Sequence, residues 1–586
     1  MKNLFHTGDL LAEMLCRYGV THVFGMPGGQ TAAFYDGIHR RIDRIQHVLV
    51  RDERSAAYAA DAYARLTGKP GVCDVTVGPG TTKLPDGLLE ALNASIPLIA
   101  IVGDLPRDWE YMRDHGIGSQ GFDQYAFLQS MTKRTWIVPN QKSLPLLVRS
   151  AFRVATSGRP GPVALIIPHD VLDQAWIEDP HDLDIDERHT NVPAQRVGPS
   201  RQAVQDALEL IGQAQRPALV VGGGIHSSKA YAALAEFAQR TDALVVTSFS
   251  GKGAISDASP LSGGVINPLG SPAAIELVQQ ADTLVWLGCK VGQNTSLNWL
   301  LPLPGQKSVQ LDIDGTELGR TFRPDVAVVA DVREFLELLL EKLPKVSRPD
   351  WRTEIARCKQ QLDSRGKLAT GTQGALNPAA VIQALAHFIG PDDVVVSDAS
   401  FSAGWVAQNI GAQSAGRHFL FGRGLGGLGY AIPAAIGAAS INTKGRVITV
   451  SGDGAASYAL GELASHALHG LKTIHIVLNN GALGWLKIWE KLFFTGLSQS
   501  VMLESEEADI SFAAVAKALG CEGHSVKEFE ALKLALEKAF HSDKSTLIDV
   551  RTDVWATSVH GYERRLKTGE FYDRPGTVYE SRPWVR

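Results

Sequence analysis

Runs of apolar residues recur along the chain, and segments with helical periodicity separate them. The runs PLIAIVG (97–103) and PVALIIP (162–168) are apolar throughout, as is typical of strands buried on both faces of a parallel sheet. The first helical segment has Thr7 as its expected cap and Gly19 as its expected stop. This alternation predicts an α/β protein with parallel sheets.

Three groups of strand-like runs predict three domains. Residues 1–186 form the first, residues 200–343 the second and residues 368–560 the third. The charged segment 344–367 is expected to be a long exposed connector. A chain of 586 residues exceeds what one hydrophobic core usually supports, which also favours several domains.

The composition argues against several classes of function. A net charge of -5 and a pI near 6.4 give no basic excess of the kind that nucleic-acid binding usually shows. The five cysteines are scattered without a CxxC pair, which favours a reducing cytosol over a disulfide framework or a zinc site. We see no signal-peptide pattern and no run of 18 apolar residues. We therefore expect a cytoplasmic protein that binds neither nucleic acid nor membrane.

The most informative segment is VITVSGDGAASYALGELASHALHGLKTIHIVLNNGALGW, which reads as a strand, a helix over 457–469 and a second strand. A right-handed crossover makes the two strands parallel, so Asp453 and Asn480 are expected at the same sheet edge. Their oxygen atoms are ligands that suit Mg²⁺. Gly452 and Gly454 let the backbone approach a phosphate, and the helix start offers N–H groups to it. Taken alone, SGDG is a common turn.

The spacing of this segment, GDG followed after 24 residues by NN, resembles the thiamine-diphosphate motif of the superfamily that includes acetohydroxyacid synthase, pyruvate decarboxylase and benzoylformate decarboxylase. The resemblance implies that Asp453, Asn480 and the backbone carbonyl of Ala482 hold Mg²⁺, which clamps the diphosphate. SDASFSAGW (397–405) resembles the other diphosphate loop of this superfamily. The cofactor-binding residues implied are Gly28, Ser400, Phe401, Ser402, Gly426, Leu428, Gly452, Asp453, Gly454, Ala455, Asn480, Ala482, Leu483 and Gly484.

A second segment, VLVRDERSAAYAADAYARLTGKPGV (48–72), resembles the part of these enzymes that carries the catalytic glutamate. The resemblance places Glu53 at that position, where it would protonate the aminopyrimidine ring of the cofactor and so drive removal of the C2 proton. Taken alone, a Glu in RDER is usually a solvated salt-bridge former. FGMPGG and AFYD (24–36), TVGPGTTKLPDGL (76–88) and SIPLIAIVGD (95–104) follow the same family order.

The glycine-rich stretch FGRGLGGLGYAIPAAIGAA (421–439) contains Gly424-x-Gly426-x-x-Gly429 and so fits the dinucleotide fingerprint by its letters. We reject that interpretation, because the fingerprint needs an acidic residue about 20 residues further on, where the thiamine loop stands instead. The resemblance implies that the Gly426 carbonyl and the Leu428 N–H contact the aminopyrimidine. The Leu428 side chain would then lie under the cofactor and bend it.

The overall resemblance is to the large subunit of acetohydroxyacid (acetolactate) synthase, and it covers nearly the whole chain. It implies three doubly wound parallel-sheet domains: pyrimidine-binding, central and diphosphate-binding. It further implies carboligation or decarboxylation of a 2-oxo acid by a homodimer or homotetramer, with active sites between the first domain of one subunit and the third domain of another. Substrate contacts are expected from Gln30, Phe122, Asp123 and Trp485, and His115, His169 and His560 are weaker candidates.

The sequence also departs from acetohydroxyacid synthases. These enzymes usually have Ser at the position of Val77, Asn at that of Lys83 and Gln at that of Asp123. In place of their Arg-Phe-Asp-Asp-Arg stretch, which grips FAD, the central domain has CKVGQNTSLNW (289–299), so either FAD or ADP remains a candidate there. The triplet Gly222-Gly223-Gly224 suits a close approach to a nucleotide or a simple βα turn.

Two alternative functions stay open. The first is a 2-hydroxyacyl-CoA lyase or oxalyl-CoA decarboxylase, which would use the same cofactor on an acyl-CoA. The second is a cofactor-binding paralogue without chemistry, against which Glu53 and the complete Mg²⁺ set argue. The tail, residues 561–586, has too little aliphatic content for a core of its own. It is expected to act as a lid or to pack against a neighbouring subunit.

Overall fold

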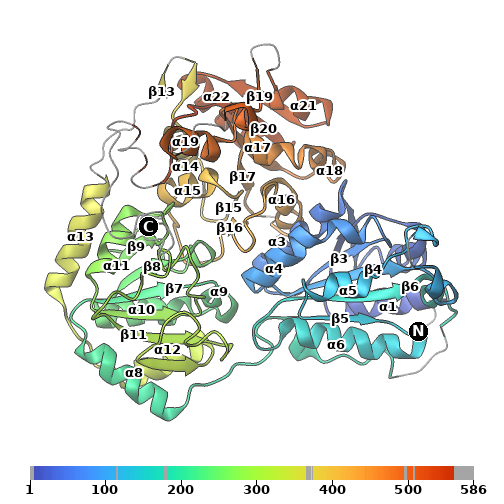
Figure 1. The fold of residues 1–586 in the computed structure, drawn as a ribbon, viewed down its shortest axis with the longest axis horizontal. Coiled ribbons are helices and arrows are strands. Elements are labelled where there is room, and N and C mark those ends of the chain that lie inside the picture. Colours follow the sequence, from blue (N-terminus) through green and yellow to red (C-terminus); the bar gives the residue numbers. More distant parts are fainter. Residues whose placement is uncertain are drawn as a thin grey trace.

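Three α/β units make up the protein. The computed structural model describes residues 5–113, 116–176, 181–363, 371–372, 374–442, 444–493, 498–505, 509–559, 562 and 566. Each unit has a six-stranded sheet whose strands all pair in parallel, so the predicted fold class is confirmed. In Figure 1 the N-terminal unit (blue) and the central unit (green) lie beside each other, and the C-terminal unit (orange to red) lies against both.

The N-terminal unit has strand order β2-β1-β3-β4-β6-β5. Its strands are β1 (His22–Gly25), β2 (Gln46–Leu49), β3 (Gly71–Val75), β4 (Leu98–Asp104), β5 (Arg134–Ile137) and β6 (Pro162–Pro168). Its helices are α1 (Thr7–Arg17), α2 (Ala32–His39), α3 (Glu53–Thr67), α4 (Pro85–Ala94), α5 (Gln124–Gln129), α6 (Leu144–Thr156) and α7 (His169–Leu172). Strands β4 and β6 are fully buried, as the continuous apolar runs predict.

The central unit has the strand order β12-β11-β10-β7-β8-β9. Strands β8 and β9 lie on one side of β7 and strands β10 to β12 on the other, so the strand order reverses between β7 and β10. Its strands are β7 (Pro217–Val221), β8 (Leu244–Thr247), β9 (Ser262–Val265), β10 (Thr283–Leu287), β11 (Lys307–Asp312) and β12 (Val326–Val329). Its helices are α8 (Arg201–Gln213), α9 (Gly224–Ser228), α10 (Tyr231–Thr241), α11 (Pro272–Gln280), α12 (Val332–Lys342) and α13 (Pro349–Asp363). In such sheets ligands bind where the strand order reverses.

The C-terminal unit has the order β16-β15-β17-β18-β20-β19, which repeats the connectivity of the N-terminal sheet strand for strand. Its strands are β15 (Val394–Ser397), β16 (Phe419–Phe421), β17 (Val447–Gly452), β18 (Thr473–Asn479), β19 (Glu522–Val526) and β20 (Thr546–Arg551), with a small hairpin of β13 (Gly371–Thr372) and β14 (Ala375–Leu376). Its helices are α14 (Pro378–Ala386), α15 (Phe401–Asn409), α16 (Ala431–Ala439), α17 (Asp453–Ser457), α18 (Leu463–Leu468), α19 (Gly484–Phe493), α20 (Ser498–Val501), α21 (Phe512–Ala518) and α22 (Phe529–His541).

Helices α3 and α16, which follow the second strand of each repeated sheet, cross each other at the centre of the molecule (Figure 1). A Cβ atom placed on Gly437 would lie 1.9 Å from the carbonyl oxygen of Ala59, so no other residue fits at this crossing. Equivalent helices of the N- and C-terminal units are therefore packed backbone to backbone.

Two local expectations were wrong. The cap of α1 is His6 rather than Thr7, because the ring of His6 accepts the backbone N–H of Asp9 at 3.1 Å while the Asp9 carboxylate accepts the N–H of His6. The segment 344–367 is not an exposed connector over its described part. It forms α13, whose Trp351 and Ile355 are buried in the central core because they lie on one helix face.

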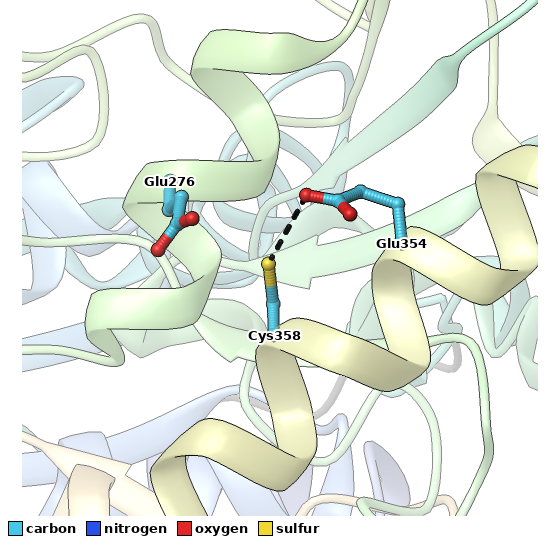
Figure 2. Close-up of side chains that lie close together, drawn as sticks. All are labelled: Glu276, Glu354 and Cys358. Atoms are coloured by element: carbon cyan, nitrogen blue, oxygen red, sulfur yellow. Dashed lines mark hydrogen bonds between the residues drawn. The ribbon is translucent and has the colours of Figure 1, made fainter.

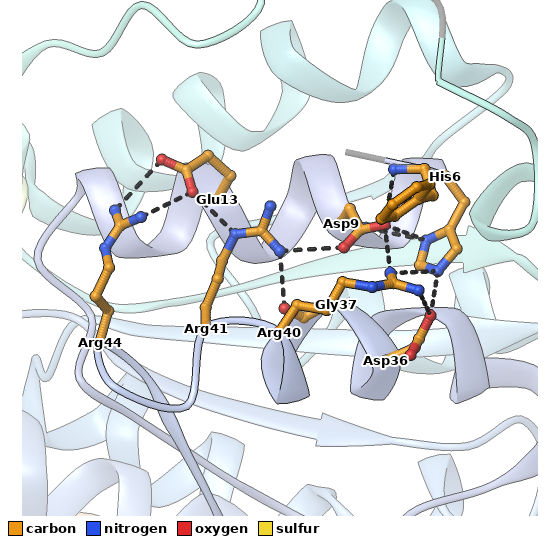
Figure 3. Close-up of polar contacts among 9 residues, drawn as sticks. His6, Asp9, Glu13, Asp36, Gly37, Arg40, Arg41 and Arg44 are labelled. Atoms are coloured by element: carbon orange, nitrogen blue, oxygen red, sulfur yellow. Dashed lines mark hydrogen bonds and ion pairs between the residues drawn. The ribbon is translucent and has the colours of Figure 1, made fainter. Parts of the chain in front are cut away.

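A network of ion pairs fixes α1 against α2 (Figure 3). Asp9 is fully buried and accepts hydrogen bonds from Arg40 at 2.7 Å and Arg41 at 3.1 Å, while Glu13 pairs with Arg41 and Arg44. Burial favours a raised pKa of Asp9, but the N–H of Phe5 and the two arginines outweigh it and lower the pKa. Of the described residues, none forms a helix long and apolar enough to cross a membrane.

We predict that Asp9→Asn lowers the free energy of unfolding by about 3 kcal/mol, because it removes the charge of a fully buried carboxylate that pairs with Arg40 and with the buried Arg41. The matched control is Asp36→Asn, which removes a 45% exposed carboxylate that pairs with the same Arg40 and should cost no more than about 0.5 kcal/mol. Because the pKa of Asp9 is lowered, its contribution is complete at neutral pH and is lost as pH falls below about 4. Equal denaturation midpoints for the two variants at pH 7 would contradict the role of Asp9.

Candidate functional site

The carboxyl ends of β15, β17 and β18 lie side by side, because these strands are neighbours in one parallel sheet. A cavity of about 200 Å³ opens at this edge. Every residue of the C-terminal unit that the sequence predicted for the cofactor lines it, except Gly426, and so does Trp485. The lining includes Ser400, Phe401, Ser402, Leu428, Gly452, Asp453, Gly454, Ala455, Asn480, Ala482, Leu483, Gly484 and Trp485.

Asp453 is the carboxylate at the centre of this edge. It accepts the N–H of Gly454 at 2.7 Å through one oxygen, and those of Asn480 and Gly481 at 3.0 and 2.7 Å through the other. It is buried, and within the described part of the chain the structure records no ion pair for it. Burial raises its pKa to about 6, although the backbone N–H groups act against this. A buried carboxylate without a cation is suited to hold a metal ion.

The segment between Asp453 and β18 differs from the single helix expected over 457–469. Helix α17 begins at Asp453 itself and ends at Ser457, and a 3₁₀ turn (η8, Leu460–Glu462) leads into α18, which ends at Leu468. Gly429 packs closely against this break, because the added Cβ of any other residue there would lie 2.6 Å from the Cβ of Tyr458. The loop that contains Gly429 therefore packs directly on the segment between α17 and η8.

The loop before α15 holds an unusual backbone conformation at its cavity face. Ser400 has φ 70° and ψ -148°, a region that non-glycine residues rarely occupy and that often marks functional sites. The following Phe401 stacks on Trp485 with 4.9 Å between ring centroids. The Ser402 hydroxyl donates to the carbonyl of Ala399 at 2.7 Å. The two aromatic rings form an apolar wall beside Asp453.

Leu428 lies in a loop that is held at both ends. Asp398, which is buried, accepts the N–H of Gly429 at 3.0 Å and that of Ala431 at 3.2 Å. Gly426, on the other side of Leu428, has φ 85°, a conformation that favours glycine. The Leu428 side chain is thereby directed to the cavity that also contains Asp453.

Glu53 lies elsewhere, at the first position of α3 in the N-terminal unit. Its side chain is buried and forms an ion pair of 2.9 Å with Lys83, the residue that replaces the usual Asn. The hydrogen bond to Glu53 raises the pKa of Lys83. The two other predicted residues on this side, Gly28 and Gln30, are close to Thr76: a Cβ on Gly28 would meet it at 2.2 Å, and the Thr76 hydroxyl donates to Gln30 at 2.8 Å.

The predicted substrate residue Asp123 is engaged as the cap of α5, where its carboxylate accepts the N–H of Ala126 at 3.0 Å. Phe122 packs edge-on against Phe127. Sequence reasoning missed the neighbouring Gln124, which is buried and accepts the Thr81 hydroxyl at 2.5 Å and the N–H of Gly78. A buried glutamine in an otherwise exposed segment is recognisable only from the fold.

The two sets of predicted residues therefore lie in separate places within one chain. The described residues that line the cavity at Asp453 all lie between Pro378 and Ala556. Glu53 and Gln30 belong to the N-terminal unit and do not line it.

A second cleft, of about 290 Å³, lies where the three units meet. The triplet Gly222–Gly224 lines it together with four cations, Arg159, Lys290, Arg417 and Arg423. Burial lowers the pKa of Lys290 to about 8. A Cβ on Gly222 would lie 2.2 Å from the Gly288 carbonyl, which supports a tight βα turn, whereas the nearest atom to one on Gly223 is 3.3 Å away.

Three side chains outside these clefts approach one another in the way that metal ligands do: Glu276, Glu354 and Cys358 (Figure 2). Arg357 pairs with both carboxylates, at 3.1 and 2.6 Å, so a cation already occupies the position between them and offsets part of their charge. The group is a structural bridge between α11 and α13. His169 pairs with Asp173 at 2.9 Å near the surface. The candidates His115 and His560, and nearly all of the tail 561–586, lie outside the described residues.

Comparison with known proteins assigns all three units to one family. Residues 5–127 match the thiamine pyrophosphate enzyme N-terminal TPP binding domain, residues 204–339 match the central domain, and residues 398–550 match the C-terminal TPP binding domain.

The chain is also similar over most of its length to individual proteins. It is 32% identical to the acetolactate synthase large subunit of Parasynechococcus marenigrum, covering 92% of this chain and 86% of that protein. It is 32% identical to the acetolactate synthase of Arthrospira platensis, covering 92% and 93%. It is 31% identical to the acetolactate synthase isozyme 2 large subunit of Escherichia coli, covering 91% and 93%.

Proposed function

Because this chain belongs to the thiamine pyrophosphate enzyme family, we propose that it is a thiamine-diphosphate- and Mg²⁺-dependent enzyme that ligates or decarboxylates a 2-oxo acid, as acetolactate synthases do. The observation that carries the proposal is the cavity at Asp453 within the matched C-terminal TPP binding domain, because residues that the resemblance implies for the diphosphate line it together. The three relatives named above are acetolactate synthases, which favours this reaction over cleavage of an acyl-CoA.

The residues at the sheet edge fit a magnesium ion. Asp453 presents a buried carboxylate that has no ion pair in the described part of the chain, and Asn480 adds an amide oxygen next to it. We assign these two residues and the backbone carbonyl of Ala482 to Mg²⁺, which binds through hard oxygen ligands and substrate phosphates. Ser400, Ser402 and the backbone at Gly454 would then face the diphosphate.

The N-terminal half-site supplies the proton chemistry. When bound, thiamine diphosphate supplies a carbanion at its thiazolium C2 that adds to the carbonyl carbon of a 2-oxo acid. Glu53 would hold a proton on the ring nitrogen of the aminopyrimidine, a role that requires a buried carboxylate. Leu428 would support the two rings from below. Phe401 and Trp485 would keep water from the reacting carbon.

We further propose that each active site is shared by two copies of the chain. Among the described residues of one chain, only the C-terminal unit lines the cavity at Asp453, while Glu53 lies on a different unit. Two chains related by a twofold axis would place Glu53 of one copy against Asp453 of the other, and the reverse. The domains 1–186, 200–343 and 368–560 would then act as pyrimidine-binding, central and diphosphate-binding domains of a dimer or tetramer.

A mixing experiment tests this arrangement. We expect Glu53→Gln and Asp453→Ala each to lose at least about 10²-fold in turnover. Co-expressing the two variants should restore about a quarter of wild-type activity, because half of the dimers are hybrids and each hybrid has one intact site. If sites were formed within one chain, every site in the mixture would carry one defect. Hybrids that form but stay inactive would refute the shared site.

The raised pKa of Asp453 predicts that Mg²⁺-dependent binding of the cofactor depends on pH. Protons compete with Mg²⁺ for this carboxylate below about pH 6, so Mg²⁺-dependent cofactor affinity should be level above pH 7 and fall by about tenfold per pH unit below 6. The pKa of the second ionisation of a terminal phosphate group is also about 6. Asp453→Asn is the matched control, since it keeps an amide oxygen but no titrating group. Calorimetry that gives the variant and the wild type the same pH slope would exclude Asp453.

For the central cleft we propose an adenosine diphosphate moiety, which both ADP and FAD contain. The four cations lining the cleft suit a diphosphate, and Gly223 leaves room for it beside the β7 turn. Asp312, at the end of β11, lines the same cleft, where an acidic residue suits a ribose hydroxyl.

Denaturing the purified protein should release this nucleotide, and flavin absorbance in the supernatant separates FAD from ADP. We expect Lys290→Met to lower the amount that copurifies by at least about tenfold, because it removes a charge-assisted contact. Lys307→Met, an exposed lysine paired with Asp325 in the same unit, is the control. The proposal fails if neither nucleotide is released or if both variants retain it equally.

A further inference from the structure

Two buried carboxylates join the repeated units in a reciprocal way. Glu90, on α4 of the N-terminal unit, accepts the backbone N–H of Gly424 at 2.9 Å and that of Leu425 at 2.7 Å. Glu462, in η8 of the C-terminal unit, accepts the N–H of Arg51 at 3.0 and 3.1 Å and that of Asp52 at 3.0 Å. Both side chains belong to residues that are 1% exposed.

The two contacts are equivalent in the repeated fold. Each carboxylate follows the third strand of its own sheet in chain order, β3 for Glu90 and β17 for Glu462. Each binds the backbone between the second strand of the other sheet and the helix after it, which are β16 and α16, or β2 and α3. These two helices are the ones that cross at Gly437.

Each bound segment leads directly to a residue of the proposed active site. Asp52 precedes Glu53, and Gly424 and Leu425 precede Gly426 and Leu428. On the C-terminal side of Leu428, Asp398 holds the same loop by accepting the N–H groups of Gly429 and Ala431. The backbone on both sides of Leu428 is thus fixed by buried carboxylates, one from each unit.

The chemistry of Glu462 suits positioning better than simple adhesion between units. Among the described residues it has no ion pair, and its remaining partners are the hydroxyl of Ser465, at 2.9 Å, and that of Ser55. Burial raises its pKa, and a buried ion with no counter-charge costs more than an apolar contact of the same size would. Glu90 differs in having Arg65 at 2.8 Å as a cationic partner.

We propose that Glu462 and Glu90 are positioning residues for catalysis: Glu462 fixes the start of α3 and so orients Glu53, and Glu90 fixes the loop that carries Leu428. This inference rests on the proposed function. It assigns a different consequence to each residue. Loss of Glu462 should impair proton transfer at the cofactor, whereas loss of Glu90 should impair cofactor binding.

The choice of variants follows from the hydrogen bonds. At position 90 each carboxylate oxygen accepts a different backbone N–H, so the NH₂ of Glu90→Gln must face a donor. At position 462 one oxygen accepts both N–H groups, and the other only shares that of Arg51, at 3.1 Å. An NH₂ in place of this second oxygen would give up the shared contact, keep both N–H groups on the first oxygen and could donate to Ser465. Glu462→Gln should therefore rescue what Glu462→Ala loses. Asp393→Asn is the control, because Asp393 accepts the N–H of Gly390 and that of Arg446 through separate oxygens at the opposite edge of the sheet.

The first measurement is hydrogen exchange of the cofactor-free protein. We expect faster exchange in peptides that contain residues 51–52 for Glu462→Ala and 424–425 for Glu90→Gln, with each change confined to its own loop. The second is thiamine diphosphate affinity by calorimetry with Mg²⁺ present. Glu90→Gln should weaken it by about tenfold, since an unsatisfied buried donor costs about 1–3 kcal/mol, and Glu462→Ala should change it by less than about threefold.

The third measurement is C2-proton exchange of bound cofactor together with turnover. Glu462→Ala should lower both by at least about tenfold at saturating cofactor, Glu462→Gln should stay within about threefold of wild type, and Asp393→Asn should match wild type. Failure of the wild type to bind thiamine diphosphate would overturn the proposed function itself. If the wild type binds but Glu462→Ala and Glu90→Gln match it in exchange, affinity and turnover, the positioning roles are wrong.

Discussion

The close crossing of α3 and α16 is the contact on which the rest of the site depends. Gly437 brings the two helix backbones together at Ala59, where a single added methyl group would overlap the carbonyl oxygen. Both helices start just beyond the second strand of their sheets, so their N-terminal ends carry Glu53 and the loop of Leu428. Fixing this crossing fixes the orientation of the N- and C-terminal units, and with it the two half-sites that each chain presents.

The carboxylates of the molecule divide according to how their charge is compensated. Asp9 and Glu13 have arginine partners, and the pKa of each is lowered although burial alone would raise it. Asp453 and Glu462 are also buried, but backbone N–H groups replace arginines around them, and burial raises the pKa of each. Partial charges from N–H groups leave part of the desolvation cost in place. Such sites are expected where function requires an available charge.

Much of the fold was predictable from the sequence, because buried parallel strands read as continuous apolar runs whatever surrounds them. The position of Asp453 and Asn480 at one sheet edge was predictable because both belong to one βαβ unit, whose handedness brings their strand ends together. Features that depend on distant contacts were not. The many charged residues of α13 suggested an exposed segment, although Trp351 and Ile355 are four residues apart and so lie on one helix face. The cap of α1 is His6 rather than Thr7, and His6 also contacts Asp36 of α2. Glu90 and Glu462 carry no local signal, since their partners are more than 300 residues away.

The duplicated connectivity also bears on how the proposed shared sites would be linked. In a dimer with sites between copies, Asp453 of one chain serves one cofactor while Glu53 of the same chain serves the other. Within that chain, Glu462 lies nine positions after Asp453, and its carboxylate accepts the backbone N–H of Asp52, next to Glu53. A route of covalent and hydrogen bonds between the two proposed sites would therefore run through a single chain and through Glu462, for which the described residues provide no ion pair. The crossing of α3 and α16 would pass a shift of one helix to the other, because the close approach at Gly437 leaves no side chain there to absorb the movement.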